Sequence, residues 1–65
     1  MNSDQFRLTI RTGNDAFEQG TAGYEIARIL REAADYIEEY GVDHHTRSLI
    51  DQNGNRVGGY KMEES

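Results

Sequence analysis

Residues 48–62 read SLIDQNGNRVGGYKM, and this stretch decides the fold because it encodes a β-hairpin. The dipeptide Asn53-Gly54 is the preferred pair for a two-residue type I′ turn, in which both central residues need a positive φ. We therefore expect two strands to flank the turn and pair with each other, with residues near 47–52 facing residues 55–62.

The register of this hairpin follows from its side chains. With a two-residue turn, Asp51 faces Arg56 and Ile50 faces Val57, so opposite charges meet and apolar side chains meet. Beyond Val57 the apolar residues fall out of strict alternation unless one extra residue is inserted. The pair Gly58-Gly59 can supply it, which predicts a β-bulge there. Close approach of a ligand to the backbone is the alternative explanation for the two glycines.

A second period-two pattern lies near the N-terminus. Phe6, Leu8 and Ile10 alternate with polar residues, which is typical of a strand with one buried face. We place this strand beside the last strand of the hairpin, which gives an all-antiparallel order of 1-3-2. The polar residues of the pattern are Arg7, Thr9 and Arg11.

The sequence from Thr21 to Tyr40 predicts one long helix. Thr21 is the best N-cap, because its hydroxyl can accept a hydrogen bond from an unpaired backbone N–H, and Gly41 is a typical C-terminal stop. Apolar residues recur every three or four positions and form one stripe that packs on the sheet. The stripe contains Ile26, Leu30, Ala33, Ile37 and Tyr40, with Ile29 and Ala34 at its flanks.

The opposite face of this helix carries charges that are sorted along the axis. From Glu32 to Asp43 there are five acids and no base, although carboxylates near a helix C-terminus cost about a few tenths of a kcal/mol each. The two bases each precede an acid by four residues, which is the less favoured order for a helical ion pair. Stability therefore does not explain the pattern. In sequence order the charged residues of this face are Arg28, Arg31, Glu32, Asp35, Glu38 and Glu39.

Two interpretations of this acidic surface remain open. It is either a solvated helix face that keeps a small protein in solution, or a binding surface for a basic groove on a partner protein. Tyr36 lies on the shoulder between the apolar and acidic faces. It is either an aromatic anchor of that surface or part of the edge of the core.

The connector before the helix, residues 12–23, is rich in Gly, Asn and Asp, which favour turns. Its single large apolar residue is Phe17. We expect Phe17 to fold back onto the core, with a contact to a partner as the alternative.

Together these elements predict an α+β fold, a small β-α-β-β domain with one helix packed on a three-stranded sheet. We expect a single domain over residues 1–65, ordered from about residue 5 to residue 62, with flexible termini. The 65 residues include no Cys, so ordinary packing must stabilise a small core, and stability should be marginal.

Charge and hydropathy exclude several classes of function. Twelve acids against seven bases give a net charge of -5, the wrong sign for gripping a phosphate backbone, so we expect no direct nucleic-acid binding. No apolar run reaches 10 residues, and MNSDQFR lacks a basic segment followed by an apolar one. We therefore expect neither a membrane span nor a signal peptide. The absence of Cys is consistent with a reducing cytoplasm.

The motifs for metal binding or catalysis fail in their details. Asp51-x-Asn53-x-Asn55 resembles a calcium loop, but its Gly falls at the fourth position instead of the sixth and no Glu closes it. Adjacent His side chains diverge, so His44 and His45 indicate a polar loop and not a metal site. No nucleophile is placed on a strained turn near a base. We therefore expect neither an enzyme nor a bound cofactor.

Three segments carry a resemblance to a known group of proteins. They are FRLTIRTGNDAF at 6–17, YEIARILREAADYIEEYG at 24–41 and LIDQNGNRVGGY at 49–60. They resemble very small proteins encoded by phages, prophages and mobile elements, and the sequence is similar to small anti-CRISPR proteins, in particular the type I-C inhibitors. The matching positions define the fold more than the activity. The link at residues 44–46 is longer than in this group and has no assigned role.

The resemblance implies a phage-encoded anti-CRISPR protein that acts in the cytoplasm of the infected bacterial host. Such an inhibitor binds a Cas protein or a type I Cascade complex and blocks capture of target DNA. We expect a monomer without membrane contact. The alternative is a small accessory or assembly protein of a phage or mobile element that dimerises through an apolar edge and is acidic only for solubility. In the first case the surface mimics DNA, and its partner-binding residues are Glu32, Asp35, Tyr36, Glu38, Glu39 and Asp43.

Overall fold

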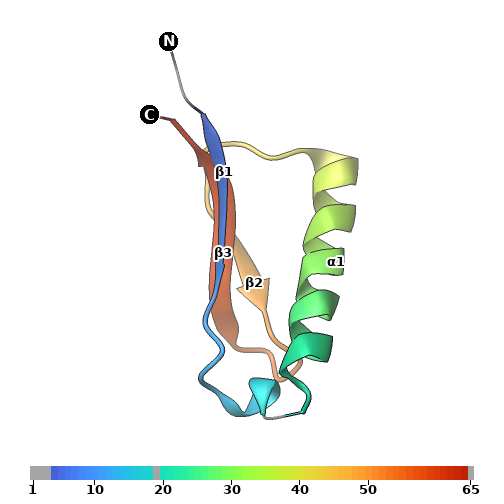
Figure 1. Cartoon of the computed structure of the whole chain (residues 1–65). Helices are drawn as coiled ribbons and strands as arrows, with labels where there is room; N and C mark the ends of the chain where they lie inside the picture. Colours follow the sequence, from blue (N-terminus) through green and yellow to red (C-terminus); the bar gives the residue numbers. More distant parts are fainter. Residues whose placement is uncertain (1–3, 19, 65) are drawn as a thin grey trace.

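The computed structural model describes residues 4–18 and 20–64 and has one helix packed on one face of a three-stranded sheet (Figure 1). The predicted α+β fold is therefore confirmed, with a short 3₁₀ helix added in the connector. The predicted flexible termini fall mainly on residues 1–3 and 65, which lie outside the described residues. The elements are β1 (Gln5–Ile10), η1 (Asp15–Phe17), α1 (Ala22–Tyr40), β2 (Arg47–Ile50) and β3 (Arg56–Glu63).

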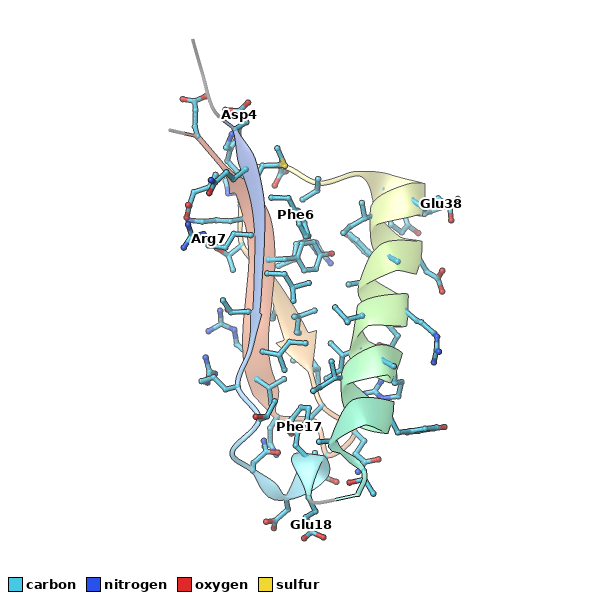
Figure 2. The ribbon with its side chains drawn as sticks, viewed as in Figure 1. Asp4, Phe6, Arg7, Phe17, Glu18 and Glu38 are labelled. Carbon is cyan, nitrogen blue, oxygen red and sulfur yellow. The ribbon has the colours of Figure 1, made fainter. Side chains whose placement is uncertain are left out.

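The sheet has the predicted antiparallel order, with β3 between β1 and β2. β1 and β3 keep an uninterrupted register, in which Arg7 pairs with Lys61 and Leu8 with Tyr60. Because side chains alternate along a strand, Leu8 packs against the core while Arg7 points away from the helix (Figure 2). The period-two pattern at the N-terminus therefore predicts both this strand and its orientation.

The turn between β2 and β3 differs from the predicted type I′ turn. Gly54 has a φ of 86°, but Asn53 does not have a positive φ. The Gly54 N–H donates to the Asp51 carbonyl at 3.0 Å, and the Asp51 N–H donates to the Asn55 carbonyl at 2.9 Å. These bonds define a three-residue loop that ends in a left-handed glycine, the next most common hairpin connection.

The side chain of Asp51 explains why the longer loop forms. Its carboxylate is only 4% exposed and accepts hydrogen bonds from the backbone N–H groups of Asn53 and Asn55, both at 2.9 Å. It also accepts from the side-chain amide of Asn14 at 2.9 Å, which ties the connector to the hairpin. Such local bonds favour turn conformations over continued strand pairing. The predicted contact between Asp51 and Arg56 is therefore wrong.

The β-bulge lies one residue before its predicted position. Leu49 pairs with Gly58 and Ile50 pairs with Arg56, so Val57 is the extra residue and the predicted pairing of Ile50 with Val57 is wrong. The bulge explains why the apolar residues of β3 do not alternate strictly. The extra residue allows the side chain of Val57 to pack in the core together with apolar residues further along β3.

The two glycines at the predicted bulge serve close approach between strands. A Cβ on Gly58 would lie 1.9 Å from the carbonyl oxygen of Thr9 in β1. A Cβ on Gly59 would lie 2.9 Å from the carbonyl oxygen of Arg47 in β2. The central strand therefore needs both residues without a side chain in order to pair on both sides.

The ends of α1 are where the sequence predicts them. Gly41 has a φ of 79° and its N–H donates to the Ile37 carbonyl at 2.7 Å, as expected of a C-terminal stop. Thr21 is the N-cap residue, but its hydroxyl does not accept from the helix. It donates instead to the Glu18 carbonyl at 2.9 Å, so it stabilises the preceding turn and does not cap the first N–H groups of the helix.

The buried stripe of α1 is rotated from the predicted one. Ile29, assigned to a flank, is 2% exposed and lies at the centre, while Leu30 and Tyr40 are 43% and 71% exposed. Glu25 takes the buried position one turn before Ile29, because its carboxylate accepts a hydrogen bond from the hairpin loop. The predicted stripe residues that do pack on the core are Ile26, Ala33 and Ile37.

The core lies between the helix and the sheet and is closed at one end by η1. Phe17 points from η1 into the space between the two layers and is 6% exposed, which confirms that it plugs the core (Figure 2). Phe6 points into the other end of this space but is 47% exposed, so that end is less well covered. The buried core residues are Ala16, Phe17, Ile29, Ala33, Leu49, Val57 and Tyr60.

Replacing Gly58 with Ala is expected to lower the free energy of unfolding by about 1–3 kcal/mol, the usual cost of overpacking, because the new methyl collides with the Thr9 backbone. Gly23→Ala is the matched control. A Cβ on Gly23 meets no atom within 4 Å, and this helical position should gain about 0.4–1 kcal/mol. Urea unfolding followed by circular dichroism measures both, and a Gly58→Ala variant as stable as the wild type contradicts the strand-approach argument.

Candidate functional site

The predicted acidic surface lies on the outer side of α1, facing away from the sheet. Asp35, Glu38 and Glu39 are all exposed, and Glu38 points directly away from the sheet (Figure 2). We call these three residues the acidic helix surface. At 1.5 Å per residue, the acidic helix surface extends about 6 Å along the axis from Asp35 to Glu39, and the predicted run from Glu32 to Glu39 extends about 10 Å.

The acidic helix surface carries carboxylates without ion partners. In the described part of the chain, the ion pairs join Arg7 to Glu63 and Arg28 to Glu25 and Glu32, and none includes a residue of the acidic helix surface. The i,i+4 pair of Arg31 with Asp35 is not formed. Within the described residues the surface is therefore not neutralised by an ion pair and is available to an external cation.

Glu32 differs from the other predicted acids because Arg28 pairs with it. Arg28 was expected on the outward face, but it lies along the flank of the helix and also donates to the Ile50 carbonyl of β2 at 3.2 Å. Its Nε and Nη2 atoms donate to both carboxylate oxygens of Glu25, at 2.7 and 2.8 Å. One guanidinium group therefore joins two acids and an edge strand, and Glu32 contributes less free charge than the sequence suggests.

Glu25 is the charged residue that sequence reasoning missed. It is 2% exposed, and besides Arg28 it accepts from the Gln52 N–H at 2.7 Å. The hydrogen bonds from Arg28 lower the pKa of Glu25 despite its burial, and the same contact raises the pKa of Arg28. The signal in the sequence is an acid four residues before Ile29, in line with the apolar stripe and followed three positions later by Arg.

Tyr36 connects the helix to β2. Its side chain is half-buried, the Arg47 guanidinium lies 3.9 Å from its ring centroid, and the Tyr40 ring centroid is 4.6 Å away. Both interpretations of Tyr36, an aromatic anchor of the acidic surface or part of the edge of the core, stay predictions. The cation–π contact brings one positive charge close to this surface.

Asp43 is not brought onto the acidic helix surface. It lies in the link between α1 and β2, where its carboxylate accepts from the His45 N–H at 2.9 Å. Its carbonyl accepts from the Met62 N–H of β3 at 2.8 Å. The link therefore holds the end of the sheet, and Asp43 contributes to its turn.

The described residues hold no group of three or more His, Cys, Asp and Glu side chains that could bind a metal ion. In the same residues, no helix is both long enough and apolar enough to cross a bilayer. Comparison with models of known protein families gives no match, and neither curated proteins nor solved structures yield one.

The free energy of unfolding is expected to fall as the pH drops below about 4.5. The pKa of Glu25 is lowered from its ordinary value of 4.5. Burial raises the pKa of Asp51, but hydrogen bonds from Asn55, Asn14 and Asn53 outweigh it and leave the pKa below 3.8. The unfolded chain therefore takes up protons first as the pH falls, and stability present at neutral pH is lost.

Thermal unfolding followed by circular dichroism between pH 7 and pH 3 measures this dependence. The double variant Glu25→Gln and Asp51→Asn should be less stable at pH 7 and should lose much less stability on acidification. An unchanged pH dependence in the double variant would show that other carboxylates cause the acid unfolding.

Proposed function

We propose that the protein binds a basic groove on a partner protein through the acidic helix surface and so excludes nucleic acid from that groove. The observation that carries the proposal is that Asp35, Glu38 and Glu39 are exposed on a long helix and have no ion partner in the described residues. If this surface served only solubility, acids paired with bases along the helix would serve equally well, so solubility alone does not explain why the acids are unpaired.

The helix holds these carboxylates in fixed relative positions. α1 has 19 residues and its inner side is fixed by Ile29 and Ala33 in the core, so the outer side chains stand on a rigid support. Positively charged grooves that bind nucleic acid recognise a row of anions along a backbone. A rigid row of carboxylates can occupy such a groove without the entropy loss of ordering a flexible acidic tail.

The resemblance to anti-CRISPR inhibitors supports the choice of partner. A Cas protein or a type I Cascade complex holds its target DNA in a positively charged channel, which is the kind of surface that these carboxylates complement. Association between such surfaces should be fast at low salt and slower as salt screens the charges.

The test is a triple charge reversal, Asp35→Lys, Glu38→Lys and Glu39→Lys. It should abolish the ability of the protein to block target-DNA binding by a type I Cascade, measured by a gel shift with purified complex. The matched control reverses Asp4, Asp15 and Glu18, which are exposed and carry the same total charge but lie off α1 (Figure 2). It should inhibit like the wild type.

Circular dichroism must show an intact helix in both variants. Inhibition that survives the reversal on α1, or that both reversals remove equally, rules out the acidic helix surface as the binding site. Failure of the wild-type protein to affect any type I effector refutes the choice of partner but leaves the surface to be tested with other basic proteins.

A second candidate function, an accessory protein that dimerises through its edge strand, is favoured by β1. Among the described strands it is at the edge of the sheet beside β3, and its Phe6 side chain is 47% exposed. Light scattering over a dilution series separates the two candidates, because a stable dimer without effect on DNA capture supports the accessory protein. A monomer at micromolar concentration contradicts it.

A further inference from the structure

The face of the sheet that α1 does not cover is basic. Four of the seven Lys and Arg residues of the chain gather there, and Arg7 points directly away from the helix (Figure 2). The other three bases belong to α1 or contact it. The four bases, which we call the open-face cations, are Arg7, Arg11, Arg56 and Lys61.

These cations surround a shallow hollow of about 180 Å³. Its lining comes from all four of them and from small or uncharged residues, and among the described residues it includes no carboxylate. The floor is Gly59, where a Cβ would lie 2.9 Å from the Arg47 carbonyl oxygen and 3.6 Å from Nη2 of Arg56. Strand pairing therefore keeps the floor free of a side chain, while one guanidinium group stands at its border.

The open-face cations are distributed along the hollow. Arg7 and Lys61 are direct partners across β1 and β3. Arg11 donates from Nη2 to the Arg56 carbonyl at 3.2 Å, at the start of β3, while Nη2 of Arg56 reaches toward Gly59. Arg7 and Arg11 are four residues apart on an extended chain, so their Cα atoms are separated by about 13 Å.

Three of these cations have no anionic partner in the part of the chain that the structure describes. Arg7 pairs with Glu63 at 3.1 Å, but Arg11, Arg56 and Lys61 make no ion pair within residues 4–18 and 20–64. Like charges held near one another without a counterion are unfavourable for the isolated chain. An anionic ligand that spans both ends of the hollow would relieve this repulsion.

We propose that the open face of the sheet binds the sugar–phosphate backbone of a single-stranded nucleic acid. A single strand carries anions at short, regular intervals and can follow a shallow surface, as a rigid convex duplex cannot. The Arg side chains offer planar forks that match phosphate oxygens. The face goes beyond the proposed function, because the acidic helix surface lies on the opposite layer and takes no part in it.

The mode of binding follows from what the face lacks. Tyr60 contributes to the lining, but it is 3% exposed and belongs to the core, where its ring centroid lies 5.7 Å from that of Phe6. No aromatic ring is therefore available on this face for base stacking, within the residues described. Binding should be indifferent to sequence and strongly dependent on salt.

This proposal departs from the expectation of no direct nucleic-acid binding, which rests on the net charge of -5 for the whole chain. That charge does not prevent a local contact at physiological salt. The helix and sheet layers are about 10 Å apart, and the acids and the open-face cations extend from their outer sides. Their separation exceeds the Debye length of about 8 Å at 0.15 M ionic strength. A strand on the open face is therefore screened from the acidic helix surface.

The test is fluorescence anisotropy with a labelled 20-nucleotide oligo-dT and the full chain at 50 mM salt. The triple variant Arg11→Gln, Arg56→Gln and Lys61→Gln should weaken binding at least tenfold. The matched control, Arg31→Glu with Ala34→Glu, makes the same change of three units in net charge on the helix layer and should bind within about twofold of the wild type. The wild-type salt slope should be about -2, from about -0.7 for each of three phosphate contacts.

Circular dichroism confirms folding of each variant, and Asp35→Lys, Glu38→Lys and Glu39→Lys together should leave oligo-dT binding intact. That result separates this proposal from the proposed function. Equal loss in the triple variant and its control overturns the proposal, because net charge alone would then explain binding. Tighter binding of poly-glutamate than of oligo-dT also overturns it, in favour of an acidic protein surface. Self-association that the triple variant removes overturns it in favour of a second copy of the chain.

Discussion

The buried carboxylate of Asp51 is the interaction on which the rest of the structure depends. A charge that is 4% exposed must be fully hydrogen-bonded, and here the partners come from two separate segments, its own loop and Asn14 of the connector. The loop that Asp51 closes also presents the Gln52 N–H to Glu25 of α1. The hairpin, the connector and the start of the helix are therefore fixed at one point, next to the plug formed by Phe17.

The contact between the hairpin loop and Glu25 determines the rotation of α1 about its axis, and this rotation determines which side chains of the helix are exposed. Since Glu25 is held by Gln52 and Arg28, the helix turns so that Leu30 leaves the core and Arg28 reaches Glu32. The carboxylates one and two turns further on remain without ion partners in the described residues. The acidic helix surface is therefore smaller than the run of acids in the sequence, because Arg28, which is held by the buried Glu25, also pairs with Glu32.

Sequence reasoning recovers the features that depend on local periodicity. The strand alternation around Leu8 and the helix end at Gly41 follow from patterns within a few residues. The predicted antiparallel order is confirmed as well, but it joins β1 to β3 from opposite ends of the sequence and has no such local signal. The hairpin register does not follow from local patterns, because the preference of Asn-Gly for a two-residue turn is outweighed by the bonds to Asp51. The position of Glu25 on the apolar stripe is visible in the sequence, but its partner is not, since that partner is a loop residue 27 positions away. Local propensity therefore fails where a buried polar group chooses a distant partner.

The same two periodicities that form the core also separate the charges of the chain. Alternation along β1 and β3 sends Leu8 and Tyr60 to the helix and their neighbours Arg7 and Lys61 to the opposite side. The helical repeat sends acids outward on the other layer. The two surfaces of opposite sign lie further apart than the Debye length in physiological salt. The affinity of a partner that contacts one surface therefore depends on the charges of that surface. The net charge of the whole chain acts mainly on the rate at which the partner approaches from a distance.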